Sequence, residues 1–289
     1  MEKQKFYTCK NDKAFKEVFM KKENKDILIP LLETCLNIKI NDIEYLNLED
    51  NVDYLNTRKK SYDLRLSTEV GRIQVEVNAN IYQYSRIRQV AYLSNEYSHV
   101  TLAGDDYSED LNVIQINFTY GLMTRFNEKY QYLYDEKDYR VYKLRDEEGK
   151  GYVDNYKIYE FNMDYYLNFW YNKDEKMIDK YKFLIMMNLD LENLEKLKRK
   201  SKVVEKYMEE INKINKDPKF IEYMSYEEDQ RKMQNTLLRK AKEEGLEKGL
   251  EQGSKEKANE VVLKMKEEGL DSSLISKITG LTIEEIKNI

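Results

Sequence analysis

Two acidic residues, Asp63 and Glu76, lie in short stretches of sequence in which polar and apolar residues alternate. The stretches cover residues 62–67 and 73–78, and such alternation is typical of half-buried β-strands. A short segment that contains a glycine separates them, so together they predict a β-hairpin. If the turn is centred between residues 69 and 70, Asp63 and Glu76 lie opposite each other with their Cβ atoms about 4.5–5.5 Å apart.

Opposed carboxylates repel each other, and a divalent cation between them removes that repulsion. In proteins, Mg²⁺ is bound by one or two carboxylates, by water and by phosphate oxygens of the substrate. The hairpin therefore points to a metal site that hydrolyses phosphodiester bonds, in which the metal activates water and offsets charge at phosphorus. The alternative is a solvated strand face, on which Arg65 or Arg72 forms an ion pair with either acid.

A basic run, Arg58, Lys59 and Lys60, lies shortly before Asp63 in the sequence. Next to a site that cleaves phosphodiester bonds, this run predicts contacts with DNA phosphates, whereas the alternative is an ordinary solvated loop. The chain has a formal net charge of -5, so a DNA-binding surface on it has to be a local patch.

Helices and further strands are predicted around the hairpin. Residues 11–19 carry apolar residues at helical spacing behind an Asn-Asp helix cap, and residues 27–35 form a second such stretch. After the hairpin, residues 81–97 predict a helix and residues 112–118 a buried strand, with a further strand at 156–161. This order predicts an α/β fold in which helices flank a sheet.

From about residue 175 onward the chain is predicted to be helical and rich in charge. We divide the sequence into a folded domain over residues 1–200, a charged helical linker over 201–257 and a small C-terminal helical motif over 258–289. The C-terminal motif resembles a helix-turn-helix fragment. Its last helix carries one basic residue, Lys287, so we expect the C-terminal helices to favour self-association into a homo-oligomer over contact with DNA.

Several classes of protein are excluded by the composition. The single histidine, His99, excludes sites with several histidines, and Cys9 and Cys35 do not have the spacing of a zinc motif. The beginning of the chain has no apolar run of the kind found in signal peptides or membrane spans. We therefore expect a cytoplasmic protein without a membrane partner, in which carboxylates and lysines carry the catalysis.

Several blocks of the sequence resemble the Rpn family of recombination-promoting nucleases, which are also described as transposases. The segment Asn-Asp-Lys-Ala-Phe-Lys-Glu-Val-Phe at 11–19 is similar to the family's opening D-x-x-F-K-x-x-F. The strands at 62–66 and 72–78 are similar to its two acidic strands, and a segment at 104–116 is similar to its G-x-x-Y block and the strand after it. The blocks occur in the family's order and span about residues 11–118.

The Rpn family belongs to the PD-(D/E)XK nuclease superfamily, so the resemblance implies a mixed sheet flanked by helices and followed by a helical tail. It also implies a metal-dependent DNA endonuclease that uses Mg²⁺, or else Mn²⁺, and acts in DNA recombination or on mobile DNA. Asp63 and Glu76 match the acidic metal ligands, and the carbonyl of Val77 matches the backbone ligand. Asp12 matches an acidic position on the first helix. Arg86 matches a basic position that predicts a phosphate contact, the alternative being a surface ion pair.

One position departs from the family's pattern. Asn78 stands where the superfamily has lysine and the Rpn family usually has glutamine, and its side chain is one methylene shorter than glutamine. Gln74 shares the strand face of Glu76 and is a candidate substitute. Two functions stay open: a nuclease with Asn78 among its catalytic residues, and a cleavage-deficient protein that binds DNA and acts as a regulator.

Overall fold

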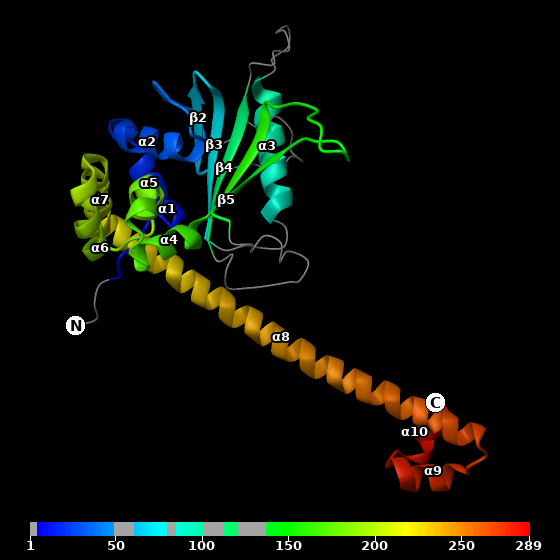
Figure 1. Cartoon of the computed structure of the whole chain (residues 1–289). Coiled ribbons are helices and arrows are strands. Elements are labelled where there is room, and N and C mark those ends of the chain that lie inside the picture. The colour runs from blue at the N-terminus through cyan, green and yellow to red at the C-terminus, as the bar shows by residue number, and fades with distance from the viewer. Residues whose placement is uncertain (1–4, 49–60, 80–84, 101–111, 121–136) are drawn as a thin grey trace. The chain divides into compact units, whose positions relative to one another are not determined.

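The computed structural model describes residues 5–48, 61–79, 85–100, 112–120 and 137–289 (Figure 1). Contacts between residues divide the chain into two compact units, Met1–Asp217 and Pro218–Ile289. All described strands and the two opposed acidic residues belong to the first unit, and the second unit is helical.

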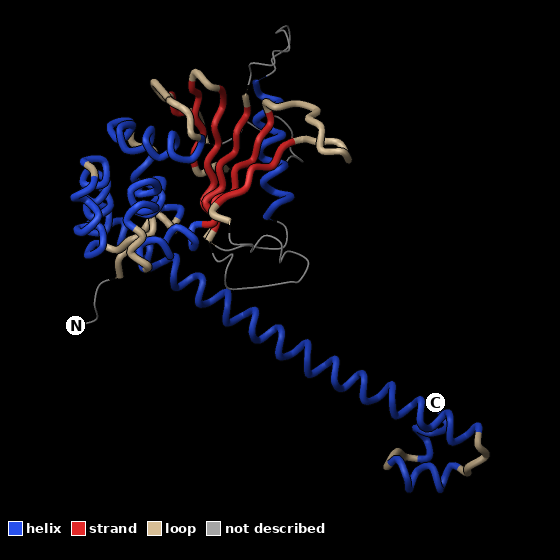
Figure 2. The backbone as a smooth tube through the Cα atoms, in the orientation of Figure 1, coloured by secondary structure: helices blue, strands red, loops and turns tan. Residues whose placement is uncertain are grey.

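The described residues of the first unit form a six-stranded sheet in the order β1-β2-β3-β4-β6-β5 (Figure 2). The central strands β3, β4 and β6 are parallel, and the outer strands are antiparallel to their neighbours. The strands are β1 (Glu44–Tyr45), β2 (Leu64–Thr68), β3 (Gly71–Asn78), β4 (Val113–Thr119), β5 (Tyr139–Lys143) and β6 (Tyr156–Asn162). The predicted α/β fold with a mixed, helix-flanked sheet is confirmed.

Helices cover both faces of this sheet. The helix α3 lies on one face, and α1 and α2 lie on the other (Figure 1). The helices of the first unit are α1 (Asp12–Phe19), η1 (Lys22–Asn24), α2 (Lys25–Leu36), α3 (Ser85–Val100), α4 (Met163–Tyr171), α5 (Glu175–Met186), α6 (Leu191–Leu197), η3 (Lys198–Lys200) and α7 (Lys202–Lys216).

The helix α1 forms as its sequence predicts. The side chain of Asn11 accepts a hydrogen bond from the backbone N–H of Ala14 at 2.9 Å and so caps the helix. Phe15 and Val18 lie on its fully buried face. The ring of Phe15 lies 6.2 Å from that of Phe118 in β4, so the helix packs directly on the apolar face of the sheet.

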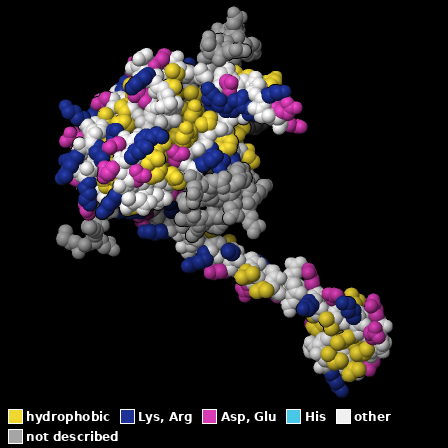
Figure 3. Space-filling view, in the orientation of Figure 1, with side chains coloured by type: hydrophobic (Ala, Val, Ile, Leu, Met, Phe, Trp, Pro, Cys, Tyr) yellow, Lys and Arg dark blue, Asp and Glu magenta, His cyan; other side chains and the backbone are white. Residues whose placement is uncertain are grey.

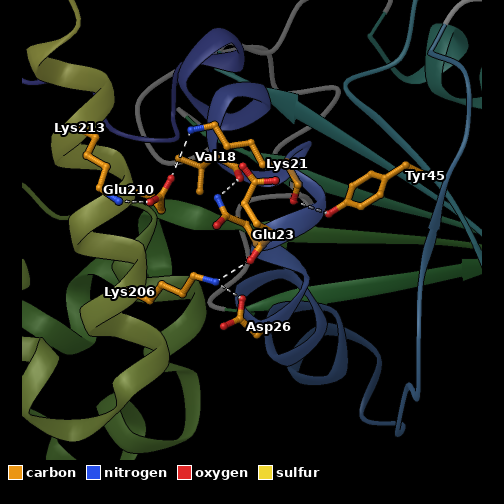
Figure 4. Close-up of polar contacts among 9 residues, drawn as sticks. Val18, Lys21, Glu23, Asp26, Tyr45, Lys206, Glu210 and Lys213 are labelled. Carbon is orange, nitrogen blue, oxygen red and sulfur yellow. Dashed lines mark hydrogen bonds and ion pairs between the residues drawn. The ribbon is translucent and has the colours of Figure 1, made fainter.

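The helix α7 fastens α1 and α2 from outside (Figure 4). Lys206 Nζ donates to the backbone carbonyl of Glu23 at 2.6 Å and lies 2.6 Å from Oδ1 of Asp26. Glu210 accepts a hydrogen bond from Lys21 at 3.3 Å, just after the end of α1. These polar contacts join α7 to the segment that follows α1 and to the start of α2.

The β2–β3 hairpin has the predicted register. Thr68 pairs with Gly71, so the turn consists of the two residues between them. Gly71 has a φ of 121°, a conformation that residues with a Cβ rarely adopt. The backbone N–H of the next residue, Arg72, donates to the carbonyl of Asn112 at 2.8 Å, which brings the turn against the chain that enters β4.

We expect Gly71→Ala to lower the free energy of unfolding by about 2–4 kcal/mol, because it combines an unfavourable φ with steric overlap. The added Cβ would overlap the backbone carbonyl of Asn112, which cannot move without disturbing β4. Gly149→Ala is the matched control, since Gly149 also has a positive φ, of 84°, but has open space around it. Urea unfolding measures both variants, and equal losses would contradict the steric argument.

The second unit consists of one long helix and a small helical core. Its helices are α8 (Pro218–Glu267), α9 (Ser272–Thr279) and α10 (Ile283–Asn288). Val262, Ile275 and Ile286 form the buried core. Asp271 caps α9, and Thr282 forms a capping box at the start of α10.

Hydrophobic side chains also gather on the surface of the second unit (Figure 3). Leu263, Leu274, Ile278 and Ile283 are each between 44% and 55% exposed. Self-association through these helices stays a prediction. In the part of the chain that the structure describes, every helix is too short or too polar to cross a membrane.

Candidate active site

Asp63 and Glu76 meet at the open end of the hairpin, opposite its turn. The register of β2 and β3, continued by one residue beyond Leu64 and Val75, places them opposite each other. The backbone N–H of Asp63 donates to Oε1 of Glu76 at 3.3 Å, and Oδ2 of Asp63 accepts from the backbone N–H of Val77 at 2.9 Å. Asp63 is 9% exposed and Glu76 is 4% exposed, so the alternative of a solvated strand face is wrong.

Two cations from different helices approach this pair of acids. Lys16 Nζ on α1 lies 2.9 Å from Oδ1 of Asp63. Arg88 Nη2 on α3 lies 4.0 Å from Oε2 of Glu76 and donates to Oδ1 of Asn78 at 3.2 Å. Since α1 and α3 cover opposite faces of the sheet (Figure 1), the pair of acids receives one cation from a helix on each face.

The environment shifts the ionisation of both Glu76 and Lys16. Burial raises the pKa of Glu76 from 4.5 to about 8, the charge of Asp63 adds to this effect, and Arg88 opposes it. Burial alone would lower the pKa of Lys16, but the charges of Asp63, Asp12 and Glu76 outweigh it and raise that pKa. Glu76 is therefore a carboxyl group that retains a proton in the absence of a stronger positive charge.

The donor groups fit a divalent cation of the magnesium type. The described residues contain no group of three or more His, Cys, Asp and Glu side chains placed to hold a metal. Mg²⁺ does not require one, since one or two carboxylates, water and substrate phosphate complete its shell. Asp63 and Glu76 bring two carboxylates together, and the backbone N–H of Val77 donates to one of them. Burial is the main cause of the raised pKa of Glu76, and a bound cation would oppose that shift.

The ionisation of Glu76 predicts how stability depends on pH. Its pKa is about 8 in the folded protein and about 4.5 when unfolded, so between these values only the folded protein keeps the proton. In metal-free buffer, the stability of the wild type should therefore fall as pH rises from about 4.5 to about 8.

Glu76→Gln should remove this fall, since a glutamine does not ionise. We expect the variant to match the wild type near pH 4 and to unfold several degrees higher at pH 8, at about 2–4 °C per kcal/mol for a protein of this size. Thermal unfolding in EDTA across the pH range measures the difference. If the difference between the unfolding temperatures of the wild type and the variant were the same at every pH, the prediction would be contradicted.

Arg86 belongs to a neighbouring polar cluster. Its Nη2 donates to Oε2 of Glu160 at 2.9 Å and to the hydroxyl of Tyr142 at 2.8 Å. Glu160 in β6 pairs in register with Asn117 in β4, which in turn pairs with Glu76 in β3. Arg86 thus forms an ion pair, which was the alternative to a phosphate contact in the sequence analysis. A contact of Arg86 with DNA phosphate stays a prediction.

Gln74 lies on the expected strand face, but its amide nitrogen is engaged away from the two acids. It donates to Oε2 of Glu96 at 3.1 Å and to the carbonyl of Tyr92 at 3.4 Å, both on α3. Arg65 also pairs with Glu96, at 2.6 Å, and not with Asp63 as the alternative had it. Gln74 and Arg65 therefore tie the sheet to α3.

The remaining predicted residues differ in what the structure shows of them. Asp12 is the exposed first residue of α1, one helical turn before Lys16. Asn78 is 5% exposed, and among the described residues its Nδ2 has no hydrogen-bond partner. The basic run 58–60 lies outside the described residues.

Sequence reasoning missed the two cations that contact the site. Lys16 is part of the F-K pair in the first block of the Rpn resemblance, which was the available signal for it. Arg88 had no signal beyond its place on a predicted helix after the hairpin. Its contact with Asn78 depends on how α3 packs on the sheet.

Comparison with known proteins gives one match. The family model for PD-(D/E)XK nuclease family transposases matches residues 9–241 of the chain. The matched segment includes α1, the β2–β3 hairpin and α3, which supply all the residues of the candidate site. Neither a curated protein nor a solved structure matches the chain significantly.

Proposed function

Because the chain belongs to the PD-(D/E)XK nuclease family transposases, we propose that it is a divalent-metal-dependent DNA endonuclease with Asp63 and Glu76 as metal ligands. The carbonyl of Val77 is the third proposed protein ligand. Mg²⁺ is the proposed cofactor, and Mn²⁺ is expected to replace it. Within this proposal the protein acts in the cytoplasm, on DNA that undergoes recombination or belongs to mobile elements.

The observation that carries the proposal is the buried pair of opposed carboxylates. Asp63 and Glu76 are brought together by the register of the hairpin, and Glu76 has a pKa of about 8. Burying two acids in contact is destabilising unless positive charge accompanies them. Such an arrangement is typical of a site whose function requires it.

The proposed reaction is hydrolysis of a phosphodiester bond. The oxygen of a water molecule bonds to phosphorus, the bond from phosphorus to one sugar oxygen breaks, and that oxygen takes up a proton. A bound divalent cation would activate the water and offset charge on the phosphate oxygens. Asp63 and Glu76 would hold the cation. Lys16 and Arg88 place positive charge beside them, which favours the approach of a phosphate.

The direct test is nicking of supercoiled plasmid by the purified protein. Mg²⁺ or Mn²⁺ should convert supercoiled DNA to open-circle and linear forms, and EDTA should abolish the conversion. Metal-independent cleavage would contradict the proposed mechanism. Intact plasmid, oligonucleotide duplex and single strand at every metal concentration would overturn the proposed activity.

A second candidate is a cleavage-deficient protein that binds DNA and acts as a regulator. Asn78 favours it, since the family motif has a lysine at that position. Electrophoretic mobility shift in EDTA, together with Asn78→Gln and Asn78→Lys, separates the two candidates. Binding without cleavage in the wild type, with cleavage gained in either variant, would support this second candidate over the first.

A further inference from the structure

Position 78 of this chain carries no positive charge, although the (D/E)XK motif in the family's name has a lysine two residues after its acidic residue. The corresponding residues are Glu76, Val77 and Asn78. Asn78 is 5% exposed, and its Oδ1 accepts a hydrogen bond from Arg88 at 3.2 Å. A short, neutral and buried amide cannot place a cation beside a substrate phosphate, so another residue has to supply it.

Lys16 places an ammonium group at this site from a different element. Its Nζ lies 2.9 Å from Oδ1 of Asp63, and its side chain is 24% exposed, so it is reachable from solvent. The helix that carries it is held by buried Phe15 against the ring of Phe118. An ammonium has three N–H donors, and the ion pair with Asp63 uses one of them. The described part of the chain supplies no partner for the others.

Arg88 is the other cation near the two acids, but it is placed differently. Its side chain is 52% exposed, and it lies 4.0 Å from Glu76, beyond hydrogen-bond distance. Its guanidinium carbon lies 5.7 Å from the ring centre of Tyr92, and one of its nitrogens holds Asn78. Lys16 makes the closer contact with the two acids, 2.9 Å against 4.0 Å, and its ammonium is less screened by solvent than the guanidinium of Arg88.

We propose that Lys16 is the catalytic lysine of this site, and that its ammonium contacts a non-bridging oxygen of the scissile phosphate while it holds Asp63. This lysine lies on helix α1, whereas the PD-(D/E)XK motif of the superfamily has its lysine at the position that Asn78 occupies on strand β3. This inference rests on the proposed nuclease function. It also explains why Asn78 is compatible with cleavage: the charge reaches the phosphate from the face covered by α1.

The test compares four variants with the wild type in two assays. Lys16→Met removes the charge, Lys16→Arg keeps it, and Lys16→Met with Asn78→Lys returns a lysine to β3. Lys13→Met is the matched control, because Lys13 is on the same helix and pairs with exposed Glu17 at 2.7 Å. Plasmid nicking gives the cleavage rate, and calorimetric titration of the DNA-free protein with Mn²⁺ gives the metal affinity.

Lys16→Met should reduce cleavage about 10²–10³-fold, the usual effect of removing one group that stabilises transition-state charge. It should tighten Mn²⁺ binding about tenfold, because a cation beside the carboxylates is gone. Lys16→Arg should cleave within about tenfold of the wild type, and the double variant should recover at least about tenfold over Lys16→Met. The control should leave both readouts unchanged.

The outcomes separate this inference from the proposed function. If the wild type cleaves and Lys16→Met cleaves equally well, Lys16 is not the catalytic lysine. If the wild type is inactive and Asn78→Lys becomes active, Lys16 does not fill the role of the missing lysine. If neither the wild type nor any variant cleaves, the proposed function fails. The Mn²⁺ affinity then tests the inference alone: an affinity of Lys16→Met equal to that of the wild type would refute the effect of the Lys16 charge on the two carboxylates.

Discussion

Asp63→Asn and Glu76→Gln are each expected to reduce metal-dependent cleavage by about a thousandfold or more, since each removes a proposed ligand of the cation that would stabilise the transition state. Both substitutions keep the size of the side chain, so the hairpin should form unchanged. Glu76→Gln should at the same time stabilise the metal-free protein at pH 8, because it removes a carboxyl whose pKa is raised to about 8 by burial.

A loss of activity together with a gain of stability is the pattern expected of a functional residue and not of a structural one. Nicking assays and thermal unfolding of the same preparations measure it. Asp42→Asn is the matched control, because Asp42 is an exposed acid that pairs with Lys25 at 2.7 Å, away from the hairpin end. Full cleavage by either active-site variant would remove that residue from the proposed site.

Glu96→Ala is expected to destabilise the protein by about 3–5 kcal/mol, the cost of leaving one member of a buried ion pair without its partner. Glu96 is 2% exposed, and its Oε2 accepts hydrogen bonds from Arg65 at 2.8 Å and from Gln74 at 3.1 Å. Without the carboxylate, the guanidinium of Arg65 loses its charge partner inside the protein.

Urea unfolding of Glu96→Ala beside Glu96→Gln separates charge from shape, since the amide keeps part of the hydrogen bonding. The control is Glu260→Ala, which removes an exposed pair with Lys264 at 2.6 Å on α8 and should change the unfolding midpoint little. If Glu96→Ala changed the unfolding midpoint as little as the control does, water or another side chain would have to replace Glu96 as the partner of Arg65.

The hairpin could be predicted because all its determinants are local. Alternation of polar and apolar residues fixed which side chains share a face, and a short glycine-containing turn fixed the register that opposes Asp63 and Glu76. The helix α1 was predictable for the same reason, since its cap and its apolar spacing lie within nine consecutive residues.

The cations of the site could not be found in this way, because their positions depend on packing between distant segments. Lys16 reaches Asp63 only because α1 lies on the sheet, and Arg88 reaches Asn78 only through the packing of α3. The strand β5 was missed for another reason: its side chains alternate between exposed and half-buried, so it has no apolar face to detect.

The pairing of Lys16 and Arg88 with the two acids has an effect beyond the site itself. With Glu76 protonated near neutral pH, the four groups have no net negative charge, and the repulsion that two bare carboxylates would exert on a polyanion is absent. On the proposed function, DNA phosphates would then approach within a Debye length, about 8 Å at physiological salt, before any metal is bound. Long-range electrostatics would therefore allow the nucleic acid to bind either before or after the metal.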